Sequence, residues 1–401
     1  MMSMKNYFLI IAFLLSASIH VEAQAIAVEL DEALSIAGRH YLLLERDQQR
    51  IDQQQRLIKA SIQQPLTEVF LAGQQLDLAG MGINGIGISQ SLNWPGARSK
   101  RSAAQKQRAI LANAVLEITR MELEKEVAIA YYELLFAKEA LNLSRSQAEL
   151  MAELVELAQL RFELGETGKI PVLSAQGKEK EAVLKLQQAR HNSELAHVIF
   201  NNWLYTDTLY TTASSQLPAA SGYLNWFVNG GHPAILQKQE EINLAESQII
   251  TERSWLLPQI STGMQLQMID EDSPFYAYHL GMKVPLAQKS IRSRVEGARM
   301  EVEIKSKELE ALREELENER RVLITAIKKE QETIDFLQNE MLPLAEEQID
   351  ASRRAYSQGA VDYQDYLQNL EQAIDTRWRH LGAKKNYHLL RLQLEFLSGR
   401  K

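Results

Sequence analysis

The sequence has no cysteine, and its 401 residues include only nine prolines and 19 glycines. Without cysteine the chain can form no disulfide, use no catalytic thiol and bind no metal through a thiolate. It also has no N-terminal cysteine that could carry a lipid. Few prolines and glycines favour long helices, because these residues most often end them. The formal net charge of −8 argues against a nucleic acid partner.

Long apolar runs are missing as well. No stretch after the first 23 residues reaches the roughly 18 to 20 apolar residues of a membrane-spanning helix. The N-terminus has a positive Lys5, a short apolar run over Phe8–Ala17 and the cleavage pattern Val21-Glu22-Ala23. These are the three parts of a secretory signal. We therefore expect residues 1–23 to be a signal peptide and the protein to be exported, in preference to a buried N-terminal helix.

Patterns that carry chemistry are also lacking. We find no nucleophile–base pair, no metal-spaced cluster and no phosphate-binding loop, so we expect no enzyme, no metal site and no cofactor. The eight histidines are scattered, and His380 and His388 are too far apart for a one-turn metal pair. We interpret both as surface or packing residues.

Two similar stretches, about half the chain apart, each end a long helical pattern on a glycine. One is Arg161–Gly165 and the other is Arg354–Gly359. Glycine adopts the left-handed helix-capping conformation at little cost, so each stretch is predicted to be the tip of a helical hairpin. The alternative is that the glycines serve only as helix caps.

The same order of elements is predicted twice around these tips: helix, two strands, long helix, turn, returning helix. Residues 24–204 form the first predicted repeat, 205–231 a linker and 232–401 the second repeat. The first copy contains helix Leu30–Ile62, strands Val69–Leu78 and Ile86–Trp94, helix Ala97–Glu163 and helix Val172–Trp203. The second contains a helix from 232 to Leu257, strands Ile260–Met268 and Tyr276–Val284, helix Ser290–Ser357 and helix Val361–Leu397.

Local signals refine this plan. Gly80, Gly82 and Gly85 are expected to form the first strand turn, and Asp270–Pro274 the second. Pro343 should kink the second long helix. A heptad stripe, interrupted at Glu330, is predicted along that helix at Leu309, Leu316, Leu323, Leu337 and Leu344.

The strands alternate apolar and polar residues, which is the pattern of a barrel wall with lipid outside and water inside. Four strands cannot close a barrel, since about eight are the practical minimum. Three copies of the chain would supply about twelve. The long helices, about 100 Å each at 1.5 Å per residue, have narrow apolar stripes suited to coiled-coil packing. The predicted fold is therefore mainly α with a membrane β-barrel portion.

The exported start, the duplicated plan and two motifs together resemble the TolC family of outer-membrane efflux channels. The motifs are Met341–Glu346 and Ala355–Gly359, the latter followed by Asp362–Leu367. This resemblance implies a homotrimer with a shared twelve-stranded barrel in the outer-membrane lipid of a Gram-negative bacterium and a periplasmic α-helical tunnel. It further implies a passive exit duct that works with a periplasmic adaptor and an inner-membrane RND-type pump.

The resemblance also assigns roles to the tips. It implies adaptor docking by Arg161, Leu164, Gly165, Thr167, Tyr356, Gly359, Ala360 and Val361. It implies a pore gate at Asp362 and Asp365, although a second family aspartate is replaced here by Gln368. The alternative for both aspartates is stabilisation of a helix N-terminus.

Other functions stay open at this stage. Chains of this length resemble the family members paired with metal-cation pumps. An exit duct for protein secretion driven by an ABC transporter would have the same sequence pattern. A periplasmic coiled-coil scaffold or adaptor is the third possibility, but an adaptor would carry a lipoyl-like β domain and one hairpin rather than two.

Overall fold

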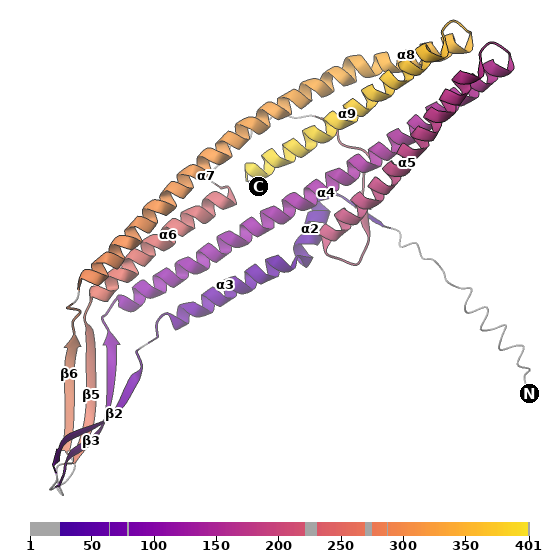
Figure 1. Cartoon of the computed structure of the whole chain (residues 1–401). Helices are drawn as coiled ribbons and strands as arrows, with labels where there is room; N and C mark the ends of the chain where they lie inside the picture. Colours follow the sequence, from indigo (N-terminus) through magenta and orange to yellow (C-terminus); the bar gives the residue numbers. More distant parts are fainter. Residues whose placement is uncertain are drawn as a thin grey trace, which may run out of the picture. The chain divides into compact units, whose positions relative to one another are not determined.

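The structure is a computed structural model that describes residues 25–63, 65–77, 80–220, 231–268, 275–286 and 288–399. The expected signal peptide and the expected turn Asp270–Pro274 lie outside the described residues, as does the linker stretch 221–230. Twice along the chain, a helix is followed by two strands, a long helix and a returning helix (Figure 1). The repeat boundaries at 204 and 232 remain a prediction.

The chain forms two compact units, and each unit draws on both predicted repeats. The tip unit consists of Met1–His40, Glu126–Ala220 and Glu330–Leu389. The sheet unit consists of Tyr41–Lys125, Ser221–Lys329 and Leu390–Lys401. The repeats of the sequence are therefore not the compact bodies of the fold.

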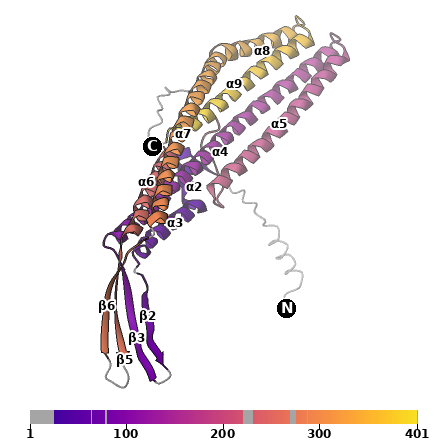
Figure 2. The same cartoon turned by 60° about the vertical axis from the view of Figure 1, so that its left-hand side comes forward.

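The sheet unit is built around four antiparallel strands: β2 (Thr67–Asp77), β3 (Gly80–Asn93), β5 (Gln259–Met268) and β6 (Phe275–Lys283). They lie side by side in the order β2-β3-β5-β6 (Figures 1 and 2). The expectation that Gly80, Gly82 and Gly85 form a turn is wrong, because all three belong to β3. The register pairs Gly80 with Asp77 and Gly85 with Ala72, so ladder hydrogen bonds outweigh the weak strand preference of glycine.

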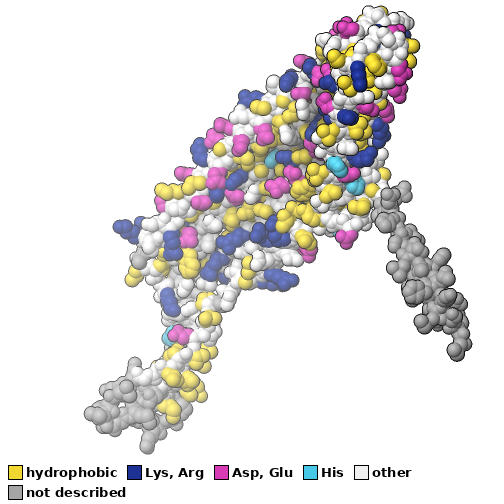
Figure 3. All heavy atoms as spheres, turned by 45° about the vertical axis from the view of Figure 1, so that its right-hand side comes forward, with side chains coloured by type: hydrophobic (Ala, Val, Ile, Leu, Met, Phe, Trp, Pro, Cys, Tyr) yellow, Lys and Arg dark blue, Asp and Glu magenta, His cyan; other side chains and the backbone are white. Residues whose placement is uncertain are grey.

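The register places the apolar residues of the strands on one face. Ile88 lies opposite Val69 and Met264, and Met264 lies opposite Tyr278. This face is exposed along its length, at Val69, Leu71, Ile86, Ile88, Met264, Met268, Tyr276, Tyr278, Leu280 and Met282. In Figure 3 hydrophobic side chains gather on the strands, whereas charged side chains are spread over the helices.

Among the described residues, no helix is both long enough and apolar enough to cross a membrane.

The helices of the sheet unit include α3 (Leu42–Ala60), α6 (Pro233–Arg253) and the first parts of α4 (Ala97–Glu163) and α7 (Gln288–Phe336). The predicted helix Leu30–Ile62 is broken at Tyr41 into α2 (Leu30–His40) and α3, because Tyr41 has an extended backbone. Ile51 of α3 packs against Ala112 and Leu116 of α4.

Pro343, where a kink is predicted, lies at the start of α8 (Leu342–Ser357) and follows a π-helical turn over Leu337–Met341. Proline lacks the N–H that would continue the α-helical ladder, and a π turn changes which residues share a face. Leu309, Leu316, Leu323 and Leu337 are buried as the heptad predicts. Leu344, beyond the π turn, is exposed instead, so the predicted stripe is wrong at this residue.

The tip unit contains α2, α8, α5 (Lys169–Leu204), the second part of α4 and most of α9 (Tyr363–Leu397), whose residues from Leu390 on belong to the sheet unit. Its core joins both hairpins, with members such as Leu154 of α4, Ala175 of α5, Ile349 of α8 and Leu370 of α9. A short parallel pair, β1 (Ile26–Val28) and β4 (Tyr210–Thr212), was not predicted. Strands of three residues are too short to leave a periodic signal.

Asp47 fixes α3 against α4, and its replacement should destabilise the sheet unit. Its buried carboxylate accepts hydrogen bonds from Arg46 Nε (2.8 Å) and Thr119 Oγ1 (2.7 Å). Asp47→Asn should lower the free energy of unfolding by about 1–3 kcal/mol, because it leaves buried groups poorly paired. Denaturant unfolding would measure the loss, and Asp52→Asn, exposed on the same helix, is the control.

The same site predicts a pH dependence. The Arg46 hydrogen bond lowers the pKa of Asp47 below its usual value of 3.8. A lowered folded-state pKa gives stability that is present above the unfolded pKa and is lost as pH falls through the folded one. Unfolding of the parent should therefore become easier below about pH 4, and Asp47→Asn should flatten this dependence. Equal acid sensitivity in both proteins would contradict this role.

Candidate functional site: the paired helical tips

The first tip is the turn between α4 and α5. Gly165 has a φ of +72°, in the left-handed region. Its N–H donates to the Phe162 carbonyl at 3.0 Å, and the Glu166 N–H donates to the Arg161 carbonyl at 2.9 Å. These two bonds form a Schellman motif, which satisfies carbonyls at a helix C-terminus.

The second tip, between α8 and α9, has the same backbone geometry. Gly359 has a φ of +74°. Its N–H donates to the Tyr356 carbonyl at 3.1 Å, and the Ala360 N–H donates to the Ala355 carbonyl at 2.8 Å. Both glycines are thus helix caps, and their left-handed backbone sets the shape that each tip presents.

Arg161 connects the two tips of one chain. Its Nε donates to Glu166 Oε2 on its own tip at 3.1 Å. Its Nη1 donates to the carbonyls of Tyr356 and Val361 on the other tip, each at 3.3 Å. The guanidinium also lies over the Tyr356 ring, 4.7 Å from the ring centroid. One side chain therefore holds two turns that are almost 200 residues apart in sequence.

An aromatic layer lies beneath the tips. The buried Tyr356 stacks on Tyr366 with ring centroids 4.9 Å apart. Burial raises the pKa of both phenols. The Tyr363 hydroxyl donates to Ser174 Oγ of α5 at 3.0 Å, which links α9 to the first hairpin. These contacts join the two tips to each other and to the helices beneath them.

The predicted docking residues separate into two groups. Leu164, Gly165, Gly359 and Ala360 are exposed, and Leu164 is the only large apolar side chain in this group, with 65% of its surface accessible. Thr167 and Val361 are partly exposed. Arg161 and Tyr356 face inward, where they support the exposed turn from below.

The two predicted gate aspartates are both exposed but make different contacts. Asp362 precedes α9, and its Oδ1 accepts a hydrogen bond from the Asp365 N–H at 2.9 Å. This is an N-cap contact, so Asp362 does stabilise a helix N-terminus. Asp365 lies in the first turn of α9, and its side chain is exposed.

Polar contacts join the two hairpins further along, and the sequence had not indicated them. Lys178 Nζ lies 2.7 Å from Glu371 Oε1, Trp378 Nε1 donates to Gln147 Oε1 at 3.2 Å, and Arg353 pairs with Glu153. The Glu371 hydrogen bond raises the pKa of Lys178. Local sequence carries no signal for such pairs, because the partners are about 200 residues apart.

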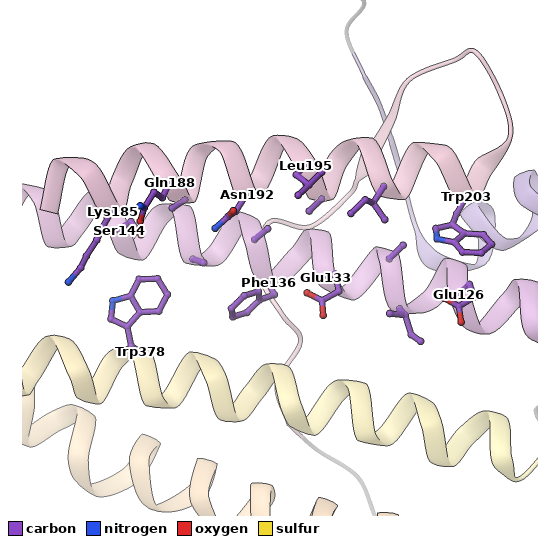
Figure 4. A pocket seen from close by; sticks show the side chains of 17 residues that line it. Glu126, Glu133, Phe136, Ser144, Lys185, Gln188, Asn192, Leu195, Trp203 and Trp378 are labelled. Atoms are coloured by element: carbon purple, nitrogen blue, oxygen red, sulfur yellow. The ribbon is translucent and has the colours of Figure 1, made fainter. Parts of the chain in front are cut away.

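A groove of about 630 Å³ runs along α4 and α5, with Trp378 of α9 at one end (Figure 4). Phe136, Leu195 and Trp203 are among its apolar lining residues. Leu184, Leu195, Val198 and Ile199 on α5 are exposed in the single chain. The tip unit thus presents an apolar surface along α4 and the C-terminal half of α5.

Across the described residues, no group of three or more His, Asp or Glu side chains is arranged to hold a metal ion.

Two helical hairpins with matching capped tips, in one chain with a sheet that is apolar on one face, define an outer-membrane channel subunit with a helical extension. The family model described as "Outer membrane efflux protein" matches residues 77–198 and 229–400, so the chain belongs to this family. The protein is an outer-membrane efflux channel, as the resemblance to the TolC family implied.

Relatives and solved structures agree with this assignment. The cobalt-zinc-cadmium resistance protein CzcC of Cupriavidus metallidurans is 22% identical over 323 residues, covering 76% of this chain and 74% of the relative. The fold is similar to that of CusC, with a TM-score of 0.78, 14% identity and 96% of each chain covered. It is also similar to the Campylobacter jejuni CmeC outer membrane channel, with a TM-score of 0.74 and 15% identity. This match covers 95% of this chain and 90% of the CmeC chain.

Replacing Arg161 should loosen the two tips from each other. Arg161→Ala removes the two hydrogen bonds and the cation–π contact to the second tip, which together contribute on the order of 1–3 kcal/mol. Because the chain has no cysteine, spin labels on Leu164→Cys and Gln358→Cys would report the distance between the tips. We expect one narrow distance distribution in the parent and a broad one in Arg161→Ala.

Arg161→Lys should give an intermediate width, since lysine keeps the charge but lacks the planar fork. Arg145→Ala, exposed on the same helix, is the control and should keep the narrow distribution. A narrow distribution in Arg161→Ala would show that the aromatic layer alone holds the tips.

Proposed function

We propose that three copies of this chain form the exit duct of a tripartite efflux system. The main support is the sheet: within the described chain, β2 and β6 each have only one partner strand. Unpaired backbone groups cost several kcal/mol each in lipid, so spanning sheets close into barrels. Three four-stranded sheets would close a barrel of about twelve strands, within the range of outer-membrane barrels.

The groove on α4 and α5 supports the same assembly. We infer that it receives a helix of a second copy, because its apolar residues continue onto the exposed face of α5. A cylinder of helices around a water-filled duct would cover this face and leave polar side chains toward the water. Transport energy would come from a partner pump.

We infer that the exposed part of the tips, Leu164, Gly165, Gly359 and Ala360, is where a periplasmic adaptor docks. Function often lies on exposed turns that a rigid scaffold positions. Arg161 and Tyr356 would act indirectly, by holding the two turns in register.

We further infer divalent metal cations as the exported class and an inner-membrane RND-type pump as the energy source. The support is the similarity to CzcC, a cobalt-zinc-cadmium resistance protein. Deletion of the gene should sensitise the bacterium to zinc, cobalt or cadmium, and the intact gene should restore growth. Unchanged metal tolerance together with a loss of drug or protein export would reassign the cargo and keep the duct.

A trimer predicts the mass of the protein extracted from the outer membrane. Light scattering of the protein from outer membrane, with the detergent subtracted, should give three times the mass of the mature chain. The double variant Leu195→Asp/Ile199→Asp should be monomeric, because it would bury charges without partners. The double variant Gln187→Asp/Arg190→Gln, also exposed on α5, is the control and should remain trimeric.

One result would remove this assembly, and another would move the contact between its copies. A monomeric parent would remove the duct. A trimer that survives Leu195→Asp/Ile199→Asp would keep the duct but place the contact between copies outside the groove.

The roles of Asp365 and Asp362 can be tested separately, because the two side chains make different contacts. Asp365→Ala should raise single-channel conductance and lower cation preference in planar bilayers, because a ring of exposed carboxylates attracts cations and narrows the pore. Asp362→Ala should instead lower stability by about 1 kcal/mol through loss of the N-cap. Unchanged currents in Asp365→Ala would remove its role as a gate.

A further inference from the structure

Positive charge gathers where two strands lead into the long helices. Residues 97–108 contain five Lys or Arg and no acidic residue, and residues 288–299 contain four Lys or Arg and one acidic residue. The first stretch follows β3 and the second follows β6. The chain as a whole has a net charge of −8, so this concentration of positive charge is local.

A pocket of about 290 Å³ lies at this junction, within the sheet unit. Arg101, Lys283 and Arg294 line it, and none of its described lining residues is acidic. Asn93 and Gln259, whose amides can donate hydrogen bonds, line it as well. The pocket therefore combines cations with neutral donors, which are the groups that bind an oxyanion. We call it the junction pocket.

The three cations are only partly neutralised within the chain. Arg294 Nε lies 3.7 Å from Glu252 Oε2, which is the one ion pair found at these cations among the described residues. The Arg101 guanidinium lies over a tryptophan ring, 5.6 Å from its centre. Lys283 Nζ donates to the neutral Ser91 Oγ at 3.2 Å. Three positive charges and one carboxylate leave two positive charges for a ligand.

The strand register places the pocket on the polar face of the sheet. Met282 lies in a row of the apolar face. Successive residues of a strand point to opposite faces, so the next row, which is Asn93, Gln259 and Lys283, belongs to the polar face. The hydrogen bond from Lys283 to Ser91, another residue of the polar face, agrees with this direction. The pocket is therefore lined from the face opposite the apolar one.

We propose that the junction pocket binds a divalent oxyanion, such as inorganic phosphate, inside the duct. This inference rests on the proposed function, because the polar face lines the water-filled lumen of a barrel that has lipid outside. Arginine and lysine bind phosphate oxygens through charge-assisted hydrogen bonds. The two positive charges without a carboxylate match the charge of the ligand.

The phosphate of a lipid headgroup has the same chemistry as free phosphate. The register favours the free anion, because the acyl chains of a lipid need an apolar surface and the strands present theirs on the opposite face. Three copies of the chain would place three junction pockets around the lumen. Positive charge that lines a pore favours anions, so the pockets would lower the cation preference of the duct.

The test is equilibrium dialysis of radiolabelled inorganic phosphate against the purified mature protein in a neutral detergent, at a mildly alkaline pH that keeps phosphate divalent. We expect a single phosphate per chain. The triple variant Arg101→Gln/Lys283→Gln/Arg294→Gln should bind phosphate at least about tenfold more weakly, because it removes the charged donors. Equal binding by the parent and this variant would overturn the proposal.

The control variant Lys307→Gln/Arg313→Gln/Arg321→Gln removes the same charge from exposed positions on α7. Lys307 is 13 residues beyond Arg294, which is about 20 Å along a helix. In about 0.1 M salt this distance exceeds the Debye length of about 10 Å, so the control should bind phosphate within about twofold of the parent. A loss as large as that of the triple variant would overturn the proposal.

Phosphatidylglycerol distinguishes the two sources of the anion. Added to the detergent micelles, it should leave the labelled phosphate bound, because the apolar face cannot hold its acyl chains beside the pocket. Displacement of phosphate by phosphatidylglycerol, but not by the zwitterionic phosphatidylcholine, would identify a lipid headgroup site and overturn the proposal.

A single change covers the case in which the triple variant does not fold. Lys283 is exposed at the end of β6, so Lys283→Gln should fold and should weaken phosphate binding by about fivefold. Binding equal to the parent would overturn the proposal.

Currents in planar bilayers test the position inside the duct. In a potassium chloride gradient the triple variant should reverse at a more cation-selective potential than the parent, and phosphate should reduce the current of the parent alone. Phosphate binding in dialysis together with unchanged currents would place the site outside the duct and overturn the proposal. A monomeric parent would instead remove the duct, whereas dialysis would still decide whether the pocket binds an anion.

Discussion

The unpaired edges of the four-stranded sheet are the constraint on which the rest of the structure depends. Within the described chain, β2 and β6 each leave one side of the backbone without a strand partner, and the sheet has an exposed apolar face. Such a sheet is unsuited to water as a single copy and cannot enter lipid while its edges are open. Assembly with further copies would meet both requirements at once. In the assembly that we propose, the apolar surface on α4 and α5 would be a second contact between copies.

The tips differ from the sheet, because the contacts that hold them in place lie within one chain. Both turns use the same Schellman geometry, and Arg161 joins them through two backbone carbonyls and the Tyr356 ring. Two mobile loops would lose conformational entropy when a partner binds. Two turns that are already held in place lose less. The inward positions of Arg161 and Tyr356 would therefore suit the proposed docking, even though neither side chain would contact the partner directly.

Elements with strong periodicity could be predicted from the sequence. The alternating strands, the long helices and both glycine turns have clear local patterns, and they were found. The break at Tyr41 has no proline to mark it, and the nearby Gly38 lies inside α2. The strand pairing of Gly80 depends on a partner strand. Leu344 left its predicted stripe because of a π turn that local sequence does not reveal. The direction of Arg161 could not be predicted either, since its partners lie about 200 residues away.

The charge of particular segments differs from the net charge of the chain. The overall balance is acidic, at −8, yet the segments that follow β3 and β6 are strongly basic, while Asp365 is exposed at the second tip. Charges separated by more than a Debye length of about 8–10 Å act almost independently in physiological salt. A basic junction and an acidic tip can therefore coexist in one subunit.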